Sequence, residues 1–259
     1  MDKRIKQYFL SPAAGKRLIA KSILHIPSIV EALENRTVVI IAGTTNGYIV
    51  EEIFKLKNQD NDFSKKRFFR GISLPPKHAV NNEGRLSDES KFPGDVVIVK
   101  GKWDKGKTIF DVADSLEKGD IIIKGANAIN LKSKQAAVLI GHPKAGTISA
   151  ALQAVLGRRV ELYLPIGLEK RIDGDINEIA VKLNSTSATG SRYLPVCGNI
   201  ITELEAINII TGAHAELVAS GGVCGAEGSC WIAVCGTQEQ LSEVDALIKD
   251  VAGEPSFEL

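Results

Sequence analysis

The sequence predicts an α/β fold, and two patterns along the chain carry this prediction. Short continuous runs of β-branched and aliphatic residues alternate with longer segments whose apolar residues recur at helical spacing. Runs without a polar residue at every second position are typical of parallel strands that are buried on both faces. We therefore expect residues 1–190 to form a Rossmann-like, three-layer domain around a parallel sheet. Residues 191–259 should form a smaller, ferredoxin-like α+β domain.

The elements of the first domain can be predicted in chain order. Ser11-Pro12 predicts a helix start, because serine caps helix N-termini and proline fits the first turn. Pro27 should break or kink that helix. The expected strands cover residues 37–42, 95–99, 120–123, 136–140 and 160–164. The expected helices cover residues 48–56, 108–117, 147–156 and 175–183. The polar segment 57–89 is long for a loop, so we expect a further strand near residues 68–72.

Beyond residue 190 the expected order of elements changes to βαββαβ. The strands should cover residues 193–197, 215–219, 230–234 and 255–259, and the helices residues 202–211 and 238–251. This order is that of a ferredoxin-like unit, in which two helices stack on one face of an antiparallel sheet. Small exposed sheets with a glycine-rich hairpin, here residues 221–228, commonly pack against a partner. A homo-oligomer is therefore expected.

The composition is that of a globular protein without a strong charge excess. The 259 residues carry a formal charge of +1, which argues against a dedicated nucleic-acid binder. No apolar run approaches the roughly 18 residues that a membrane span needs. The N-terminus is too polar for a signal peptide, so a cytoplasmic protein is expected. The four cysteines lack a CxxC spacing and are predicted to be free thiols, and no metal site and no cofactor are expected.

Three glycine-containing loops follow predicted parallel strands, at the sheet edge where open α/β sheets bind ligands. The first is the strand-to-helix loop after residue 42. Its glycines let backbone N–H groups approach an anion at a helix N-terminus. The candidate ligand-binding residues are Gly43, Thr44, Thr45, Asn46 and Gly47. The alternative interpretation is a tight turn with threonine caps.

The second loop follows residues 120–123. It offers a lysine and two amides to the hydroxyl or phosphate oxygens of a ligand. The candidate ligand-binding residues are Lys124, Gly125, Ala126, Asn127 and Asn130. A turn stabilised by its asparagines is the alternative interpretation.

The third loop follows residues 136–140 and offers a lysine, an imidazole and the free N–H groups of a helix start. Lys144, Gly146 and Thr147 are candidate ligand-binding residues. Lys144 and His142 are also candidate catalytic residues, for proton transfer or charge stabilisation. The alternative for His142 is a structural role, because it lies beside a proline.

Two of these segments resemble a known superfamily. Residues 16–52 (KRLIAKSI…VVIIAGTTNGYIVEEI) resemble the opening of the ribose-5-phosphate isomerase, glucosamine-6-phosphate deaminase and CoA-transferase superfamily, and especially the sugar-phosphate sensor domains of DeoR-type repressors. Residues 120–130 (DIIIKGANAIN) are similar to the strand and loop of ribose-5-phosphate isomerases and methylthioribose-1-phosphate isomerases. The resemblance covers roughly residues 12–165. It implies a phosphate, sugar or acyl-CoA ligand at the Gly43 loop.

One departure from the isomerase pattern bears on catalysis. The isomerase loop D-G-A-D-E carries carboxylates, whereas this chain has Lys124, Asn127 and Ala128 at the corresponding positions. An aldose–ketose isomerase needs a general base, and an amide has no useful basicity. Ribose-5-phosphate isomerase activity is therefore not expected unless another acid, such as Glu51 or Glu52, substitutes.

The sequence thus predicts a protein that binds a small phosphorylated metabolite, such as a sugar phosphate, and leaves open whether it also transforms it. One alternative is a non-catalytic module for metabolite sensing or assembly. Another is a CoA-ester or nucleotide binder of the same fold.

Overall fold

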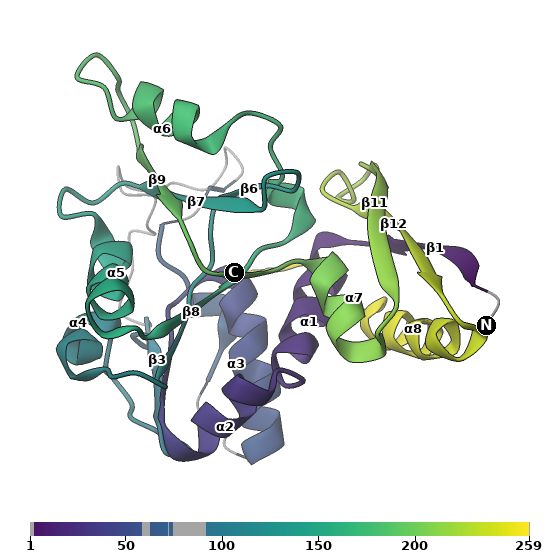
Figure 1. Ribbon diagram of the computed structural model, residues 1–259, viewed down its shortest axis with the longest axis horizontal. Helices are drawn as coiled ribbons and strands as arrows, with labels where there is room; N and C mark the ends of the chain where they lie inside the picture. Colours follow the sequence, from purple (N-terminus) through teal and green to yellow (C-terminus); the bar gives the residue numbers. More distant parts are fainter. Residues whose placement is uncertain (1–2, 59–62, 72, 75–91, 259) are drawn as a thin grey trace.

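The computed structural model describes residues 3–58, 63–71, 73–74 and 92–258. It contains a six-stranded mixed sheet and two smaller antiparallel sheets of three strands each, with helices packed around them (Figure 1). The predicted α/β class is confirmed. Within the described residues, no helix combines the length and the apolarity needed to cross a membrane.

The central sheet has the strand order β10-β8-β5-β2-β3-β4. Its strands are β2 (Thr37–Ile40), β3 (Val96–Val99), β4 (Lys102–Trp103), β5 (Ile121–Ile123), β8 (Glu161–Pro165) and β10 (Asn199–Ile201). The strands β10, β8, β5 and β2 run parallel, as expected for three of them. The prediction that residues 95–99 form another parallel strand is wrong, because β3 pairs with β2 in the antiparallel direction. A run that is buried on both faces has the same apolar pattern in either direction, so the pattern does not reveal the direction.

A second correction concerns the expected parallel strand at residues 136–140. This run is part of β7 (Gln135–Ile140), which lies between β6 (Ala128–Asn130) and β9 (Arg192–Val196) in a separate antiparallel sheet. The physical reason is the tight connection between β6 and β7, in which Asn130 Oδ1 accepts hydrogen bonds from the backbone N–H groups of Lys132 and Ser133. So short a connection joins only antiparallel strands.

The third sheet has the order β1-β12-β11 and lies to one side of the central sheet (Figure 1). It consists of β1 (Arg4–Leu10), β11 (His214–Ser220) and β12 (Cys230–Gly236). The ferredoxin-like arrangement of residues 191–259 is not confirmed. The strand at 192–196 belongs to the β7 sheet, residues 255–258 form no strand, and β1 was not predicted at all. Because β1 pairs with β12 and β10 joins the central sheet, strand pairings cross the predicted boundary near residue 190 in both directions.

Most of the expected helices are present. They are α1 (Pro12–Ile23), α2 (Pro27–Asn35), α3 (Thr44–Lys57), α4 (Ile109–Val112), α5 (Gly146–Arg158), α6 (Ile176–Leu183), α7 (Glu203–Thr211) and α8 (Gln238–Val251). Short 3₁₀ turns cover Lys65–Arg67, Ala113–Ser115 and Leu168–Lys170. The Ser11 side chain caps α1, and Pro27 separates α1 from α2, as predicted. In place of the strand expected near 68–72, residues 68–71 are irregular, and residue 72 lies outside the described residues.

The central sheet is buried on both faces, which explains its unbroken apolar runs. In β2, Val38 and Ile40 pack in one core cluster with α1, α3 and the small β1-β12-β11 sheet. Val39 packs in the other cluster, together with α5. The four cysteines are free, as predicted.

Candidate functional site

The loops after β2 and β5 lie next to each other at one edge of the central sheet. The two strands are parallel neighbours, with Ile40 opposite Ile123. Asn46, fully buried on α3, donates from Nδ2 to the carbonyls of Ile41 at 2.7 Å and Ile123 at 3.2 Å. The rule that placed the first two loops at a common carboxyl edge therefore holds. Asn46, predicted as a ligand contact, links the two strand ends through its amide nitrogen.

The N-terminus of α3 has no side-chain cap among the described residues. Gly43 is the N-cap residue, with extended backbone (φ −176°). The Thr45 hydroxyl is buried and has no hydrogen-bond partner among the described residues. The first N–H groups of a 14-residue helix favour negative charge through their free donors and the helix dipole. Gly47 does not face this end, because its Cβ position lies 2.8 Å from Lys65 Cβ.

Lys124 follows β5 directly, and its side chain is buried, with 9% of the residue exposed. Its ammonium group has one polar contact within the described part of the chain, a long one of 3.4 Å to the carbonyl of Gly125. Burial lowers the pKa of Lys124 to about 8; Asp95 opposes this change, and Lys170 and Arg70 add to it. The site thus contains a buried cation that no described carboxylate contacts directly.

Three further charged residues lie near Lys124, and none of them is among the candidate site residues that the sequence predicted. Asp95 is fully buried, and both of its oxygens accept hydrogen bonds. Oδ1 accepts from the N–H of Ala42 at 2.9 Å, and Oδ2 accepts from the N–H of Ile109 at 2.8 Å. Arg70 also donates to each of the two oxygens at 3.3 Å. Arg70 Nε is buried without a described partner. Lys170 donates to the carbonyl of Ala126 at 3.1 Å.

We call Thr44, Thr45, Arg70, Lys124 and Lys170 the edge site. Asp95 pairs with Arg70 and acts on Lys124, whereas Glu169 and Glu203 act on Lys170. Lys124 is therefore the cation of this site that no described carboxylate contacts directly. Lys170 follows β8 and could have been found by the same carboxyl-edge rule as Lys124. Asp95 precedes an antiparallel strand and Arg70 comes from an irregular segment, so the carboxyl-edge rule finds neither of them.

Glu203 lies on the neighbouring strand-to-helix junction, after β10. It is buried at the start of α7, and its Oε2 accepts a hydrogen bond from the N–H of Leu168 at 2.9 Å. Burial and the nearby Glu169 raise the pKa of Glu203. Glu169 itself pairs with Lys16 at 3.2 Å. The raised pKa favours the protonated form of Glu203, which would add no negative charge to this edge of the sheet.

The predicted candidates Asn127 and Asn130 have structural contacts in the β6–β7 hairpin. Asn127 is exposed, and its Oδ1 accepts a hydrogen bond from the N–H of Leu139. Asn130 also donates to the carbonyls of Asp173 and Gly174. These contacts correspond to the alternative of an asparagine-stabilised turn. Between Lys124 and this hairpin, Gly125 has open space: no described atom lies within 4 Å of its Cβ position.

The third loop does not share the edge of the other two. His142 and Lys144 follow β7, which belongs to the antiparallel sheet, so the carboxyl-edge rule does not apply to them. His142 Nδ1 accepts a hydrogen bond from the N–H of Lys144, whose side chain is exposed. Gly146 and Thr147 begin α5. A ligand role for this loop stays a prediction. It was inferred from a sheet edge shared with the other two loops, and the structure does not show that shared edge.

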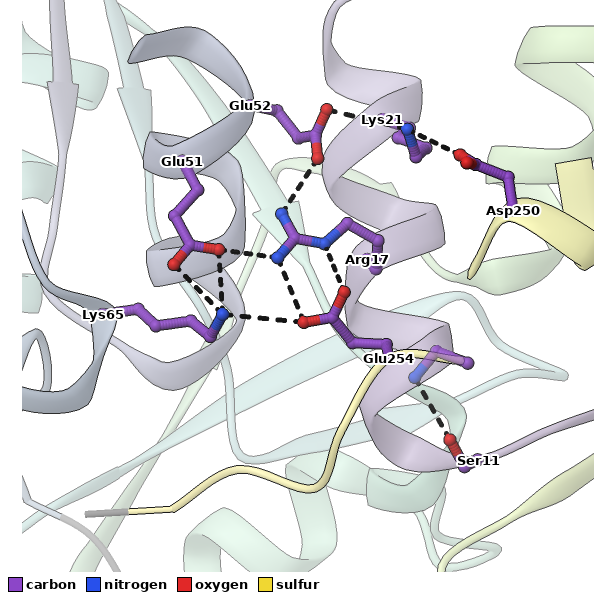
Figure 2. Close-up of polar contacts among 9 residues, drawn as sticks. Ser11, Arg17, Lys21, Glu51, Glu52, Lys65, Asp250 and Glu254 are labelled. Atoms are coloured by element: carbon purple, nitrogen blue, oxygen red, sulfur yellow. Dashed lines mark hydrogen bonds and ion pairs between the residues drawn. The ribbon is translucent and has the colours of Figure 1, made fainter. Parts of the chain in front are cut away.

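Glu51, the remaining catalytic candidate, belongs to a network of ion pairs around Arg17 (Figure 2). Arg17 lies 2.6 Å from Glu51, 2.9 Å from Glu52 and 2.8 Å from Glu254. Lys65 pairs with Glu51 at 2.9 Å and approaches Glu254 at 3.5 Å. The network joins α1 and α3 to the segment after α8. The Glu51 carboxylate is thus engaged in ion pairs within the protein, which Arg17 and Lys65 share with Glu52 and Glu254.

A cavity of about 600 Å³ lies beside this network. Its lining consists of Arg17, Lys21, Glu51, Glu52, Phe54, Lys55, Phe63, Asp250 and Glu254. Beside it, the buried ring of Tyr48 has Arg17 at 4.8 Å and Lys65 at 4.7 Å from its centroid. Most of the charged groups in the lining are paired with each other, as Figure 2 shows for Lys21 with Asp250, so this cavity offers a ligand fewer free charges than the edge site.

No protein-family model matches the chain, and neither a curated protein nor a solved structure matches it. Within the described residues, no group of three or more histidine, cysteine, aspartate or glutamate side chains could hold a metal ion. The geometry of the edge site is therefore the main guide to function.

Proposed function

We propose that the protein binds a small phosphorylated metabolite at the edge site, with the phosphate at the N-terminus of α3 and against Lys124. The observation that carries this proposal is the buried Lys124 ammonium, which no described carboxylate contacts directly. Burying an unpaired charge is costly, and a bound anion would offset that cost.

Two further features support an anion rather than a neutral ligand. Thr45 Oγ1 and Arg70 Nε are buried donors without described partners, and buried donors are normally satisfied. Lys170 adds a third cation to the same edge. The resemblance of the Gly43 and Lys124 loops to sugar-phosphate isomerases is in keeping with a phosphorylated sugar. The acidic residues of that family's loop are absent here, so the proposal includes binding and no isomerase reaction.

Thermal denaturation with added ligands tests the proposal. Inorganic phosphate and ribose 5-phosphate should stabilise the protein, whereas ribose alone should not. A ligand at about 100 times its Kd adds about 2.7 kcal/mol to the free energy of unfolding. Lys124→Met should abolish this stabilisation, and Lys182→Met, which removes an exposed lysine on α6, should leave it intact. The proposal is wrong if no phosphorylated compound stabilises the wild type, or if both variants respond like the wild type.

We also propose that the protein is a homo-oligomer that assembles through the outer face of the β1-β12-β11 sheet. This face presents Ile5, which is 72% exposed, and the neighbouring rings of Phe9 and Trp231. Light scattering at tens of micromolar should give a mass above that of one chain. The double variant Phe9→Ser/Trp231→Ser should be monomeric, because it removes apolar area from the contact. Phe110→Ser, at an exposed position on α4, serves as the control, and a monomeric wild type would contradict the proposal.

A further inference from the structure

The Lys124 amine differs from an ordinary ion-pairing lysine in its surroundings. It is nine-tenths buried, and Asp95, the carboxylate that acts on it most strongly, already accepts hydrogen bonds at both oxygens from Ala42, Ile109 and Arg70. At the adjoining Gly125, no described atom outside its two chain neighbours lies within 4 Å of the Cβ position. The amine is therefore buried, has no close carboxylate among the described residues, and lies next to a glycine whose Cβ position is open.

The charges around this amine favour its neutral form. Burial is the main cause of its lowered pKa of about 8, and the cations Lys170 and Arg70 act in the same direction. With such a pKa, roughly one molecule in ten carries a neutral amine at pH 7. A lysine that is desolvated and lies near other cations is activated as a nucleophile for carbonyl compounds.

We infer that Lys124 forms an imine with the carbonyl carbon of a phosphorylated aldehyde or ketone bound at the edge site. This inference rests on the proposed function, because the phosphate at the α3 N-terminus would hold the carbonyl carbon near Nζ. It also narrows the ligand class from phosphorylated metabolites in general to those with a free or ring-opened carbonyl group.

The chemistry balances without a further reactant. The Nζ lone pair forms a bond to the carbonyl carbon, and the C=O π electrons move to oxygen, which takes a proton from the nitrogen. Loss of the hydroxyl group with the second nitrogen proton then gives the C=N bond and one water molecule. Borohydride reduces this C=N bond by adding hydride to carbon, so the adduct becomes a stable secondary amine.

Lys170 is the natural comparison within the same site. Burial also lowers its pKa, but its Nζ donates to the carbonyl of Ala126 at 3.1 Å, and Glu169 acts on it as a counter-charge. The charge of Glu169 favours the protonated form of Lys170, which has no lone pair for attack on a carbonyl. If binding of the aldehyde at the edge site decides which lysine reacts, Lys124 should react faster than Lys170. If only solvent exposure decides, exposed lysines such as Lys144 and Lys182 should react fastest.

Glycolaldehyde phosphate and sodium cyanoborohydride provide the test, with peptide mass spectrometry to locate the modified lysine. At low aldehyde concentration and pH 7.5, Lys124 should be modified at least about ten times faster than Lys144. Excess inorganic phosphate should suppress this reaction. Unphosphorylated glycolaldehyde should lose the preference for Lys124, and Lys124→Met should show only the slow modification of exposed lysines.

The outcomes separate this inference from the proposed function. If phosphate stabilises the protein but Lys124 stays unmodified while exposed lysines react, the inference is overturned and the anion site stands. If Lys124 reacts equally with both aldehydes and phosphate does not protect it, the amine is reactive without a phosphate site, and both the inference as stated and the proposed function are wrong.

Discussion

Replacement of Lys124 by methionine should make the ligand-free protein more stable at pH 7, by up to about 3 kcal/mol, since each unit of pKa shift corresponds to about 1.4 kcal/mol. The folded-state pKa of about 8 lies below the ordinary lysine value of 10.5, so folding disfavours the charged form. Methionine has a similar length and carries no charge, so it removes this penalty. Denaturant unfolding in phosphate-free buffer measures the difference.

The pH dependence of this stabilisation has a definite sign. Between pH 8 and 10.5 the unfolded chain holds the Lys124 proton and the folded protein does not, so wild-type stability gains with rising pH over this window. The advantage of Lys124→Met should therefore be full below pH 8 and shrink steadily toward pH 10. A Lys124→Met variant that is less stable than the wild type at pH 7 would show that an unrecognised anionic partner already satisfies the ammonium group.

A valine side chain at position 43 or 125, in place of Gly43 or Gly125, should occupy part of the edge site. It should weaken phosphate binding at least about tenfold, which is a loss of about 1.4 kcal/mol or more in binding free energy. Neither substitution requires backbone strain. Gly43 is extended, with φ −176°, and its Cβ position has only ordinary contacts at 3.9 Å or more, whereas that of Gly125 meets no described atom within 4 Å. Both variants should fold, with a loss of at most about 1 kcal/mol at the Gly43 cap position. Calorimetric titration with inorganic phosphate measures the binding.

Gly157→Val on α5 is the matched control, because this glycine is exposed and also has no described atom within 4 Å of its Cβ position. It should bind phosphate like the wild type. Gly47→Val is unsuitable as a test, because Lys65 Cβ lies 2.8 Å from the new side chain and the helix would have to move. If both the Gly43 and the Gly125 variants bind phosphate with unchanged affinity, the phosphate does not bind at the α3 N-terminus.

The sequence by itself predicted where the buried strands lie and that three loops end at a common edge, of which the structure brings two together. Burial on both faces is recorded locally, as an unbroken apolar run, so residues 37–40 and 121–123 were recognisable as central strands. Both runs were predicted as parallel strands, so the loops after them were expected at the same sheet edge. This was enough to place Gly43 beside Lys124, which lies at the centre of the proposed site.

Only the tertiary structure decided strand direction and charge partners. The runs that became β3 and β7 have the same local pattern in either direction, and their antiparallel pairing depends on the connections and neighbours that the folded chain provides. The pairing of β1 with β12 joins opposite ends of the chain, for which no local pattern exists. Asp95, Arg70 and Lys170 likewise converge on Lys124 from separate segments. A pKa depends on desolvation and on nearby charges in three dimensions. The lowered pKa of Lys124 therefore follows from its burial and from these distant residues, and not from its neighbours in the sequence.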